Sequence, residues 1–233
     1  MTGCASLLLE CGATTIHSWS GLGVRLNEPI ETIVKNTIRK YGVRKRWKMI
    51  DILVIDEISM LSKKMFEILN HLGKVARNND SYFGGIQLIF SGDFYQLPPI
   101  GEVGDIDTYK FCFESQLWKH IFKNQIELCT IFRQRNSKYI KILNQVRKGG
   151  ISRKSYTTLL SCVGKDTSLC EIKPVRLYPR KKLVEKVYEE QLNNLTGEAV
   201  KFISKTLSTN QEITSKRDLE IFKRSGTSFY NGD

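Results

Sequence analysis

The sequence predicts an α/β protein with a parallel β-sheet flanked by helices. Two apolar segments, 51–57 and 86–93, each end in acidic residues, and an amphipathic segment lies between them. Residues 52–55 are all apolar and lead directly into Asp56 and Glu57, and a continuous apolar run is typical of a strand covered on both faces. Strand, helix and strand at this separation form a βαβ crossover, in which both strands end at the same edge of the sheet.

The helix of this crossover is predicted from its periodicity. Apolar residues recur at intervals of three and four, as on the buried side of an amphipathic helix: Met65, Ile68, Leu69, Leu72, Val75 and Ala76. The patterns elsewhere are weaker. We expect a third strand near 14–17, a short strand and then a helix within 111–122, a strand over 126–131, and helices over 137–148 and 181–195.

The composition is that of a globular protein that can bury a core. Of the 233 residues, 41% are hydrophobic and 26% are charged. No apolar run approaches the roughly 18 residues that a membrane span needs, and the apolar segment 5–9 is too short for a signal peptide. We therefore expect a soluble intracellular protein without a membrane partner.

The six cysteines occur at irregular spacings and form no C-x-x-C pair. A zinc site or a disulfide framework needs closer and repeated spacing. Free, buried thiols in a reducing compartment are therefore expected for Cys4, Cys11, Cys112, Cys129, Cys162 and Cys170.

The net charge of +12 is concentrated in the second half of the chain. Residues 1–134 carry a net charge of +2 and residues 135–233 a net charge of +10, and the segment 133–165 holds nine basic residues and no acidic one. Such a surplus favours a polyanionic partner, through phosphate neutralisation and counterion release. On charge alone, a basic surface that merely keeps the protein soluble is an equal alternative. The change in charge near residue 130 also marks a candidate domain boundary.

A second basic segment, 35–48, has seven Lys or Arg among fourteen residues, together with Tyr41 and Trp47. Basic and aromatic side chains suit single-stranded DNA, which they bind by phosphate contact and by stacking. The alternative, which we favour, is a solvated helix whose Trp47 packs beneath the following strand.

The two strand ends carry residues that suit nucleotide hydrolysis. Of the adjacent carboxylates Asp56 and Glu57, the first can hold Mg²⁺, usually through water, while the second orients the attacking water toward the γ-phosphate. This signal is modest alone, because many strands end in acids. The second strand leads into Gly92-Asp93-Phe94-Tyr95-Gln96-Leu97-Pro98-Pro99, in which glycine allows a sharp turn and the prolines stiffen the exit. The turn would hold Gln96, a neutral donor and acceptor, near both carboxylates.

Three segments resemble, in wording and in order, the petite-integration-frequency (PIF) DNA helicases of superfamily one. They are ILVIDEISML at 52–61, GGIQLIFSGDFYQLPP at 84–99 and IFRQ at 131–134. Residues 2–5 with 15–18 resemble the family's motif that follows its phosphate loop. Weaker agreement at 113–118 and 177–178 extends the resemblance over about residues 2–195.

The resemblance implies a RecA-like fold and a role for each matched residue. Asp56 would bind Mg²⁺, Glu57 would be the catalytic carboxylate, and Gln96 would be the γ-phosphate sensor that couples hydrolysis to movement. Arg133 would act like an arginine finger on the transferring phosphoryl group, so that Gln96 and Arg133 both contact ATP. The residues alone would favour an ordinary surface ion pair for Arg133.

The expected DNA contacts come from the resemblance and from the charge pattern. His17 and Ser18 match positions that lie along the family's single-stranded DNA track, although a lone histidine is as often a structural residue. Within the basic segment, Lys138, Lys141 and Lys148 are expected to contact the phosphate backbone whatever the base sequence.

Two features of the family are absent from the sequence. No G-x-x-x-x-G-K-[ST] phosphate loop occurs, and the late motifs that complete the second motor domain are missing. We therefore expect a fragment or a gene model cut short, which is inactive by itself. Residues 1–125 would form a first RecA-like motor domain without its opening strand and phosphate loop, and residues 126–233 the start of a second.

The intact protein is expected to be an ATP-dependent DNA helicase that uses ATP and Mg²⁺. By resemblance it would move 5′ to 3′ on single-stranded or forked DNA in replication, repair, recombination or telomere maintenance. It would act in a nucleus, a mitochondrion or a viral replication site, and the sequence indicates no stable protein partner. One alternative is a non-enzymatic DNA-binding remnant of a helicase. A different P-loop ATPase is a further alternative, against which Gln96, Pro98-Pro99 and Arg133-Gln134 argue.

Overall fold

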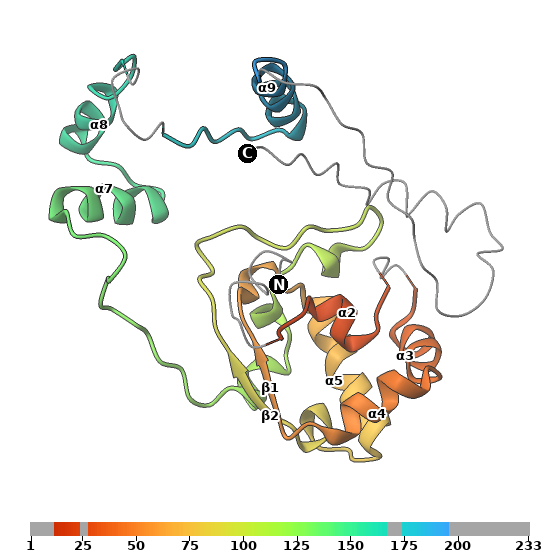
Figure 1. Cartoon of the computed structure of the whole chain (residues 1–233). Coiled ribbons are helices and arrows are strands. Elements are labelled where there is room, and N and C mark those ends of the chain that lie inside the picture. The colour runs from red at the N-terminus through yellow and green to blue at the C-terminus, as the bar shows by residue number, and fades with distance from the viewer. Residues whose placement is uncertain (1–11, 24–27, 167–173, 196–233) are drawn as a thin grey trace. The chain divides into compact units, whose positions relative to one another are not determined.

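The structure is a computed structural model that describes residues 12–23, 28–166 and 174–195 (Figure 1). The chain divides into two compact units, 1–163 and 164–233. The predicted boundary between two motor domains at residues 125 and 126 stays a prediction. In chain order the described helices and strands are α2 (Ile16–Ser20), α3 (Ile30–Ile38), α4 (Tyr41–Met49), β1 (Ile52–Ile55), η1 (Ile58–Met60), α5 (Lys63–Arg77), η2 (Tyr82–Gly85), β2 (Gln87–Phe90), η3 (Ile106–Thr108), η4 (Cys112–Glu114), α6 (Trp118–Ile121), α7 (Ser137–Arg147), α8 (Arg153–Leu160) and α9 (Lys181–Asn193), where η denotes a short 3-10 helix.

The predicted βαβ crossover is confirmed. Strands β1 and β2 pair in parallel, with Ile52 opposite Gln87 and Ile55 opposite Phe90, and α5 connects them. The helix begins after Ser62, whose hydroxyl accepts the Met65 N–H at 3.2 Å, as an N-cap residue does.

One face of this sheet is not covered within the described residues, contrary to the expectation from its continuous apolar sequence. Leu53 and Ile55 are buried in the core, whereas Ile52 is 51% and Val54 is 62% exposed. Successive side chains of a strand point to opposite faces, so the alternation assigns only one face to the core. A run of apolar residues therefore identified the strand but not how many of its faces are covered.

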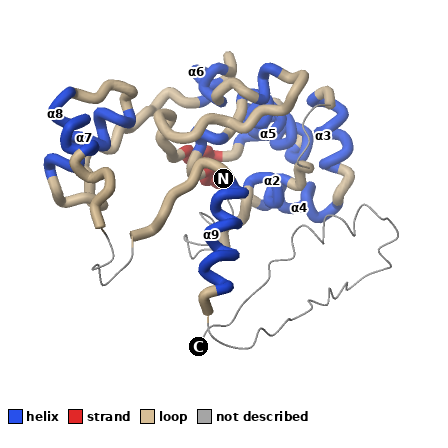
Figure 2. Tube along the Cα trace, turned by 90° about the horizontal axis from the view of Figure 1, so that it is seen from above, coloured by secondary structure: helices blue, strands red, loops and turns tan. Residues whose placement is uncertain are grey.

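The core lies between the sheet and helices α3, α4 and α5. Helix α5 contacts α3 and α4, and the two views show α3 beside α5 and α2 beside α4 (Figure 1 and Figure 2). Phe66 of α5 is fully buried and its ring lies 5.5 Å from Phe83 and 5.7 Å from Trp118. Gly73 permits the close approach of α5 and η2, because a Cβ there would lie 2.5 Å from the Phe83 carbonyl carbon. Of the predicted apolar stripe only Val75 is exposed, at 41%.

Helix α4 settles the two interpretations of segment 35–48. Trp47 is fully buried, its ring lies 4.8 Å from that of Trp19, and its indole N–H donates to the Ser20 carbonyl at 3.4 Å. Stacking of a DNA base on Trp47 is therefore excluded, and the expected burial of this side chain is confirmed. The neighbouring basic side chains Arg44, Lys45 and Lys48 are exposed.

Two of the weaker strand predictions are wrong, and a third is replaced by a 3-10 helix. Residues 14–17 lead into helix α2, because Thr15 caps its N-terminus and Gly21, at a φ of 77°, ends it. Segment 126–131 has no regular structure, and η4 occupies the position of the expected short strand before α6. Helices α7 and α9 confirm the predictions for 137–148 and 181–195, and α8 was not predicted.

The expectation for the cysteines holds only in part. Cys112 is free and buried, and burial raises the pKa of its thiol to about 12. Cys129 and Cys162 are free but exposed, because segment 126–131 forms no strand and Cys162 follows the exposed end of α8. Cys4, Cys11 and Cys170 lie outside the described residues. Within the described part of the chain, no helix is long and apolar enough to cross a membrane.

Candidate nucleotide site at the strand ends

The two predicted carboxylates, Asp56 and Glu57, directly follow β1, and both are half-buried. Glu57 has a φ of 57° and a ψ of 47°, a left-handed conformation that costs a non-glycine residue about 1 kcal/mol. The conformation is fixed from both sides, because the Ile58 N–H donates to the Ser91 carbonyl at 3.1 Å and the Met60 N–H donates to the Glu57 carbonyl at 3.3 Å. Backbone strain held in this way is concentrated at functional sites in proteins.

Gly92 brings the two strand ends into contact. A Cβ at this position would lie 2.7 Å from the Ile58 backbone nitrogen and 3.0 Å from Ile58 Cγ1, closer than side-chain atoms approach. The sequence explains the glycine by a sharp turn, and the structure shows that the close approach of Ile58 also requires a residue without a side chain. Residues 57–58 and 91–92 therefore pack directly against each other at one edge of the sheet, a contact that we call the interlock.

The turn that follows β2, residues 93–96, holds Gln96. Its backbone is closed by the Gln96 N–H, which donates to the Asp93 carbonyl at 2.9 Å, and by the Tyr95 N–H, which donates to Asp93 Oδ1 at 3.1 Å. The Gln96 side-chain amide also donates to Asp93 Oδ2, at 3.4 Å. Phe94 anchors the turn, since its ring lies 4.7 Å from that of Phe113. We name residues 93–96 the sensor turn, after the role that the family resemblance predicts for Gln96.

Sequence reasoning missed the partner of Asp93. Arg147 of α7 donates from Nε to Asp93 Oδ2 and from Nη2 to Asp93 Oδ1, each at 2.7 Å. These hydrogen bonds lower the pKa of Asp93 to about 2, and the same contact raises the pKa of Arg147. An Asp at the first position of a tight turn is a recognisable signal, but nothing in the sequence indicates which of nine basic residues in 133–165 pairs with it.

The structure does not bring Arg133 to this site. Arg133 is exposed, lies in a segment without regular structure, and makes no hydrogen bond or ion pair to any residue that the structure describes. Its predicted role as an arginine finger stays a prediction, as does the alternative of a surface ion pair.

The predicted DNA-track residues lie on α2. His17 is half-buried, and desolvation lowers its pKa, so the neutral imidazole is favoured. Ser18 is exposed, and its carbonyl accepts a hydrogen bond from Arg46 of α4 at 3.3 Å. The basic helix α4 therefore lies directly beside these two residues.

The predicted phosphate contacts of the basic segment are accessible. Lys138 and Lys141 are exposed on α7, and Lys148 is exposed at its C-terminal end. No carboxylate of the described residues forms an ion pair with them. Of the nine basic residues in 133–165, only Arg147 forms an ion pair with an acid that the structure describes.

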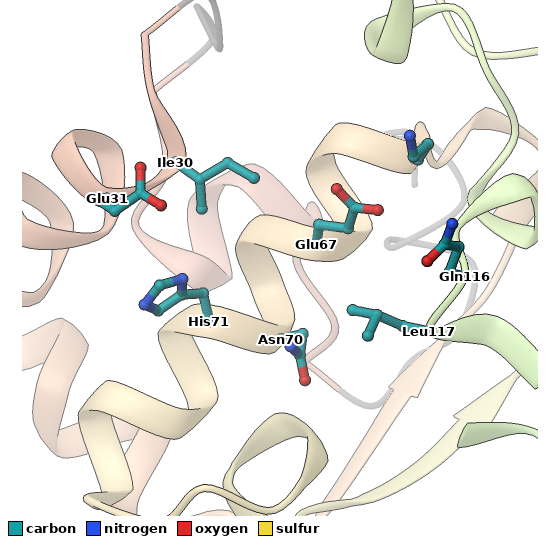
Figure 3. Close-up of a pocket in the computed structure, with 8 residues that line it drawn as sticks. Ile30, Glu31, Glu67, Asn70, His71, Gln116 and Leu117 are labelled. Carbon is teal, nitrogen blue, oxygen red and sulfur yellow. The ribbon is translucent and has the colours of Figure 1, made fainter. Parts of the chain in front are cut away.

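A shallow cavity of about 430 Å³ lies elsewhere, between α3, α5 and the start of α6 (Figure 3). Its polar groups serve the fold: Glu67 accepts the Ser115 hydroxyl at 2.7 Å, and Asn70 accepts the Phe83 N–H at 2.9 Å. None of the predicted site residues lines it. The lining residues are Ile30, Glu31, Lys63, Glu67, Asn70, His71, Gln116 and Leu117.

A parallel βαβ unit whose first strand ends in Asp-Glu, and whose second strand leads into a Gly-Asp-x-x-Gln turn, is the arrangement expected of a RecA-like fold of the helicase class. The chain belongs to the PIF1-like helicase family, whose model matches residues 1–157.

Similar proteins agree with this assignment. The chain is 35% identical over 202 residues to ATP-dependent DNA helicase RRM3 of Saccharomyces cerevisiae. The aligned region covers 86% of this chain and 27% of RRM3. The crystal structure of Pif1 helicase from Candida albicans is similar with a TM-score of 0.77 and 31% identity, over 95% of this chain and 49% of that one. Bacteroides Pif1 bound to ssDNA is similar with a TM-score of 0.64 and 25% identity, over 86% and 47% of the two chains. The predicted RecA-like α/β fold is thus confirmed, and the chain spans about a quarter of the length of RRM3.

Proposed function

We propose that this chain supplies the hydrolytic part of the ATP site of a DNA helicase, together with part of its DNA-binding surface. One observation carries the proposal: the interlock of Ile58 with Gly92 holds Glu57 and the sensor turn at the same edge of a parallel sheet. The name of RRM3 as an ATP-dependent DNA helicase supports it, as does the ssDNA bound by Bacteroides Pif1. On this proposal the intact protein moves 5′ to 3′ on single-stranded or forked DNA, in replication, repair, recombination or telomere maintenance.

Glu57 is the proposed catalytic carboxylate. It would orient the water that attacks the γ-phosphate and accept its proton. The hydrogen bonds of Ile58 and Met60 fix the backbone on either side of it. The free-energy cost of positioning the backbone of Glu57 is therefore met during folding rather than during the reaction.

Gln96 is the proposed sensor of the γ-phosphate. Its side-chain amide donates to Asp93 at 3.4 Å, a distance at which a hydrogen bond is weak. A phosphate oxygen is also a charged acceptor, and at a shorter distance it would replace this long bond while ATP is present. After hydrolysis the amide would return to Asp93.

Magnesium fits this edge as a companion of the nucleotide. No three His, Cys, Asp or Glu side chains in the described part of the chain cluster closely enough to hold a metal ion. Mg²⁺ commonly takes one or two carboxylates and completes its shell with phosphate oxygens and water, and Asp56 is the carboxylate that would hold it. Bound there, it would neutralise charge on the phosphoryl group. The Ser59 hydroxyl, 1% exposed and without a hydrogen-bond partner among the described residues, leaves a polar group unsatisfied beside this edge.

The proposed DNA contacts are the exposed Lys138, Lys141 and Lys148, with His17 and Ser18 on α2. The lysines are supported by their exposure and by the absence of acidic residues from 133–165. His17 is supported by its preference for the neutral form, which can donate to or accept from a nucleic acid without a net charge. Arg133 is proposed to contact ATP in the intact protein, on the family resemblance of residues 131–134 alone.

The decisive experiment is Glu57→Gln in the intact protein. We expect DNA-stimulated ATP turnover to fall by about 100-fold or more, because the amide cannot polarise water, while ATP affinity changes by less than about threefold. Turnover by phosphate release and affinity by nucleotide titration measure the two quantities. Glu31→Gln, which changes an exposed glutamate of α3, is the matched control and should behave as the parent. Parental turnover in Glu57→Gln would show that the assignment is wrong.

A further inference from the structure

The guanidinium of Arg147, at the C-terminal end of α7, binds the first residue of the sensor turn. It donates two 2.7 Å hydrogen bonds to the two carboxylate oxygens of Asp93, and its central carbon lies 4.6 Å from the centre of the Tyr95 ring. The same carboxylate accepts the Tyr95 N–H and the side-chain amide of Gln96. One carboxylate therefore joins the end of a helix to the residue proposed to sense the γ-phosphate.

This contact is more ordered than most ion pairs at a protein surface. Exposed pairs contribute little when two flexible side chains must be ordered for a screened attraction. Here the carboxylate of Asp93 is already fixed by the turn, and two parallel hydrogen bonds set the orientation of the guanidinium. Contact with the Tyr95 ring restricts the guanidinium further. The side chains remain 38% and 22% exposed, so the pair is accessible to water but geometrically defined.

Helix α7 connects this contact to the basic segment. Gln145 Oε1 accepts the backbone N–H and the hydroxyl of Ser152, each at 3.2 Å, and Ser152 caps α8. The exposed Lys138 and Lys141 project from the same helix. The sensor turn is therefore bonded directly to a helix that carries the proposed phosphate contacts.

We propose that Arg147 is a positioning residue, which acts through Asp93 to orient Gln96 and to transmit the release of the γ-phosphate to α7. The transmission rests on the proposed function, whereas the orientation of the turn is a property of the fold. While ATP is bound, the Gln96 amide donates to the phosphate, and Asp93 keeps its bonds to Arg147 and to the Tyr95 N–H. When phosphate leaves, the amide returns to Asp93, and α7 follows because Arg147 holds the same carboxylate.

The first test measures the turn itself in the full chain. Arg147→Gln removes the paired hydrogen bonds and the charge, Arg147→Lys keeps the charge alone, and Arg153→Gln removes a charge from α8 as a matched control. Hydrogen exchange at the Tyr95 and Gln96 amides is expected to be about tenfold faster in Arg147→Gln and intermediate in Arg147→Lys. The control should match the parent. Parental exchange in Arg147→Gln would overturn the proposal.

The second test measures coupling in the intact protein. In Arg147→Gln, the number of ATP molecules hydrolysed per base pair unwound should rise about fivefold, with the KM for ATP within about twofold of the parent. The double variant of Asp93→Asn with Arg147→Gln should be no worse than Asp93→Asn alone, because Arg147 acts through Asp93. Additive defects would overturn this route of action.

The outcomes separate the inference from the proposed function. Faster amide exchange with unchanged coupling would make Arg147 a brace of the turn and overturn the transmission. An intact protein that hydrolyses no ATP would overturn the proposed function and the transmission together. The exchange measurement on the full chain would then still decide whether Arg147 orients the sensor turn.

Discussion

The strand-end site and the basic segment 133–165 are built in opposite ways. At the strand ends, backbone hydrogen bonds and the close approach at Gly92 fix the backbone of Glu57 and of the turn that holds Gln96. In the basic segment most side chains are exposed, and Ile142 and Ser155 are the buried residues of α7 and α8. The sequence describes the first region by ordered motifs and the second by charge alone. Motifs on neighbouring strands therefore predict the geometry of a site. Composition predicts a positive electrostatic potential, but it does not say which basic side chains are already paired with carboxylates.

The two regions meet at Arg147, which belongs to the basic segment by sequence but binds Asp93 at the strand ends. The excess of positive charge in 133–165 suggests that its basic side chains lack carboxylate partners. Tertiary structure supplies one from 54 residues away, in the sensor turn. One of the nine cations is thereby paired with the strand-end site.

The largest expected contrast between the regions is in stability. Phe66→Ala should lower the free energy of unfolding by about 3–5 kcal/mol, because Phe66 is fully buried among aromatic rings. Leu143→Ala on α7, where the side chain is 39% exposed, should cost under about 1 kcal/mol. Urea unfolding measures both, and Phe66→Leu serves if the alanine variant does not fold. Equal costs would contradict the view that the core beneath the strand ends is packed more tightly than α7.

A smaller contrast is expected in the salt dependence of single-stranded DNA binding. Changing Lys138, Lys141 and Lys148 to Gln should flatten the slope of log affinity against log salt by up to about two units, since each phosphate contact contributes about −0.7. Fluorescence anisotropy over a range of salt concentrations measures the slope.

The matched control changes three lysines of α9 to Gln. Two of them, Lys181 and Lys186, pair with Glu185 and Glu190, so their loss should leave the slope unchanged. If the α7 variant keeps the parental slope, its lysines face solvent and the DNA follows another path.

The smallest expected effect is on acid stability. Because the Arg147 contact lowers the pKa of Asp93 from 3.8 to about 2, it stabilises the fold above pH 3.8 and this contribution is lost as the pH falls toward 2. Asp93→Asn should therefore make the unfolding free energy less dependent on pH between about 4 and 2. Urea unfolding across this range measures it, with the exposed Asp80→Asn as the control. An identical pH dependence in parent and Asp93→Asn would contradict the charge-paired state of Asp93.

The sequence predicted the elements that have strong periodicity. Strands β1 and β2, helix α5 and the parallel crossover were all predicted, because the apolar runs and the helical stripe are unambiguous over their lengths. The strand expected at 14–17 failed because capping by Thr15 and Gly21 outweighs the β-propensity of a short segment. The strand expected at 126–131 failed because nothing in the described chain pairs with it. Short apolar runs need a partner to become strands.

The sequence by itself determined the family, the order of the motifs and the placement of Asp56, Glu57 and Gln96 at the ends of neighbouring strands. These features follow from local patterns, since parallel strands joined by one helix must end at the same edge. Only the tertiary structure decided that one sheet face is exposed and that Asp93 binds Arg147. Each of these depends on which distant segment packs against a residue, and a side chain's own sequence neighbours carry no information about that.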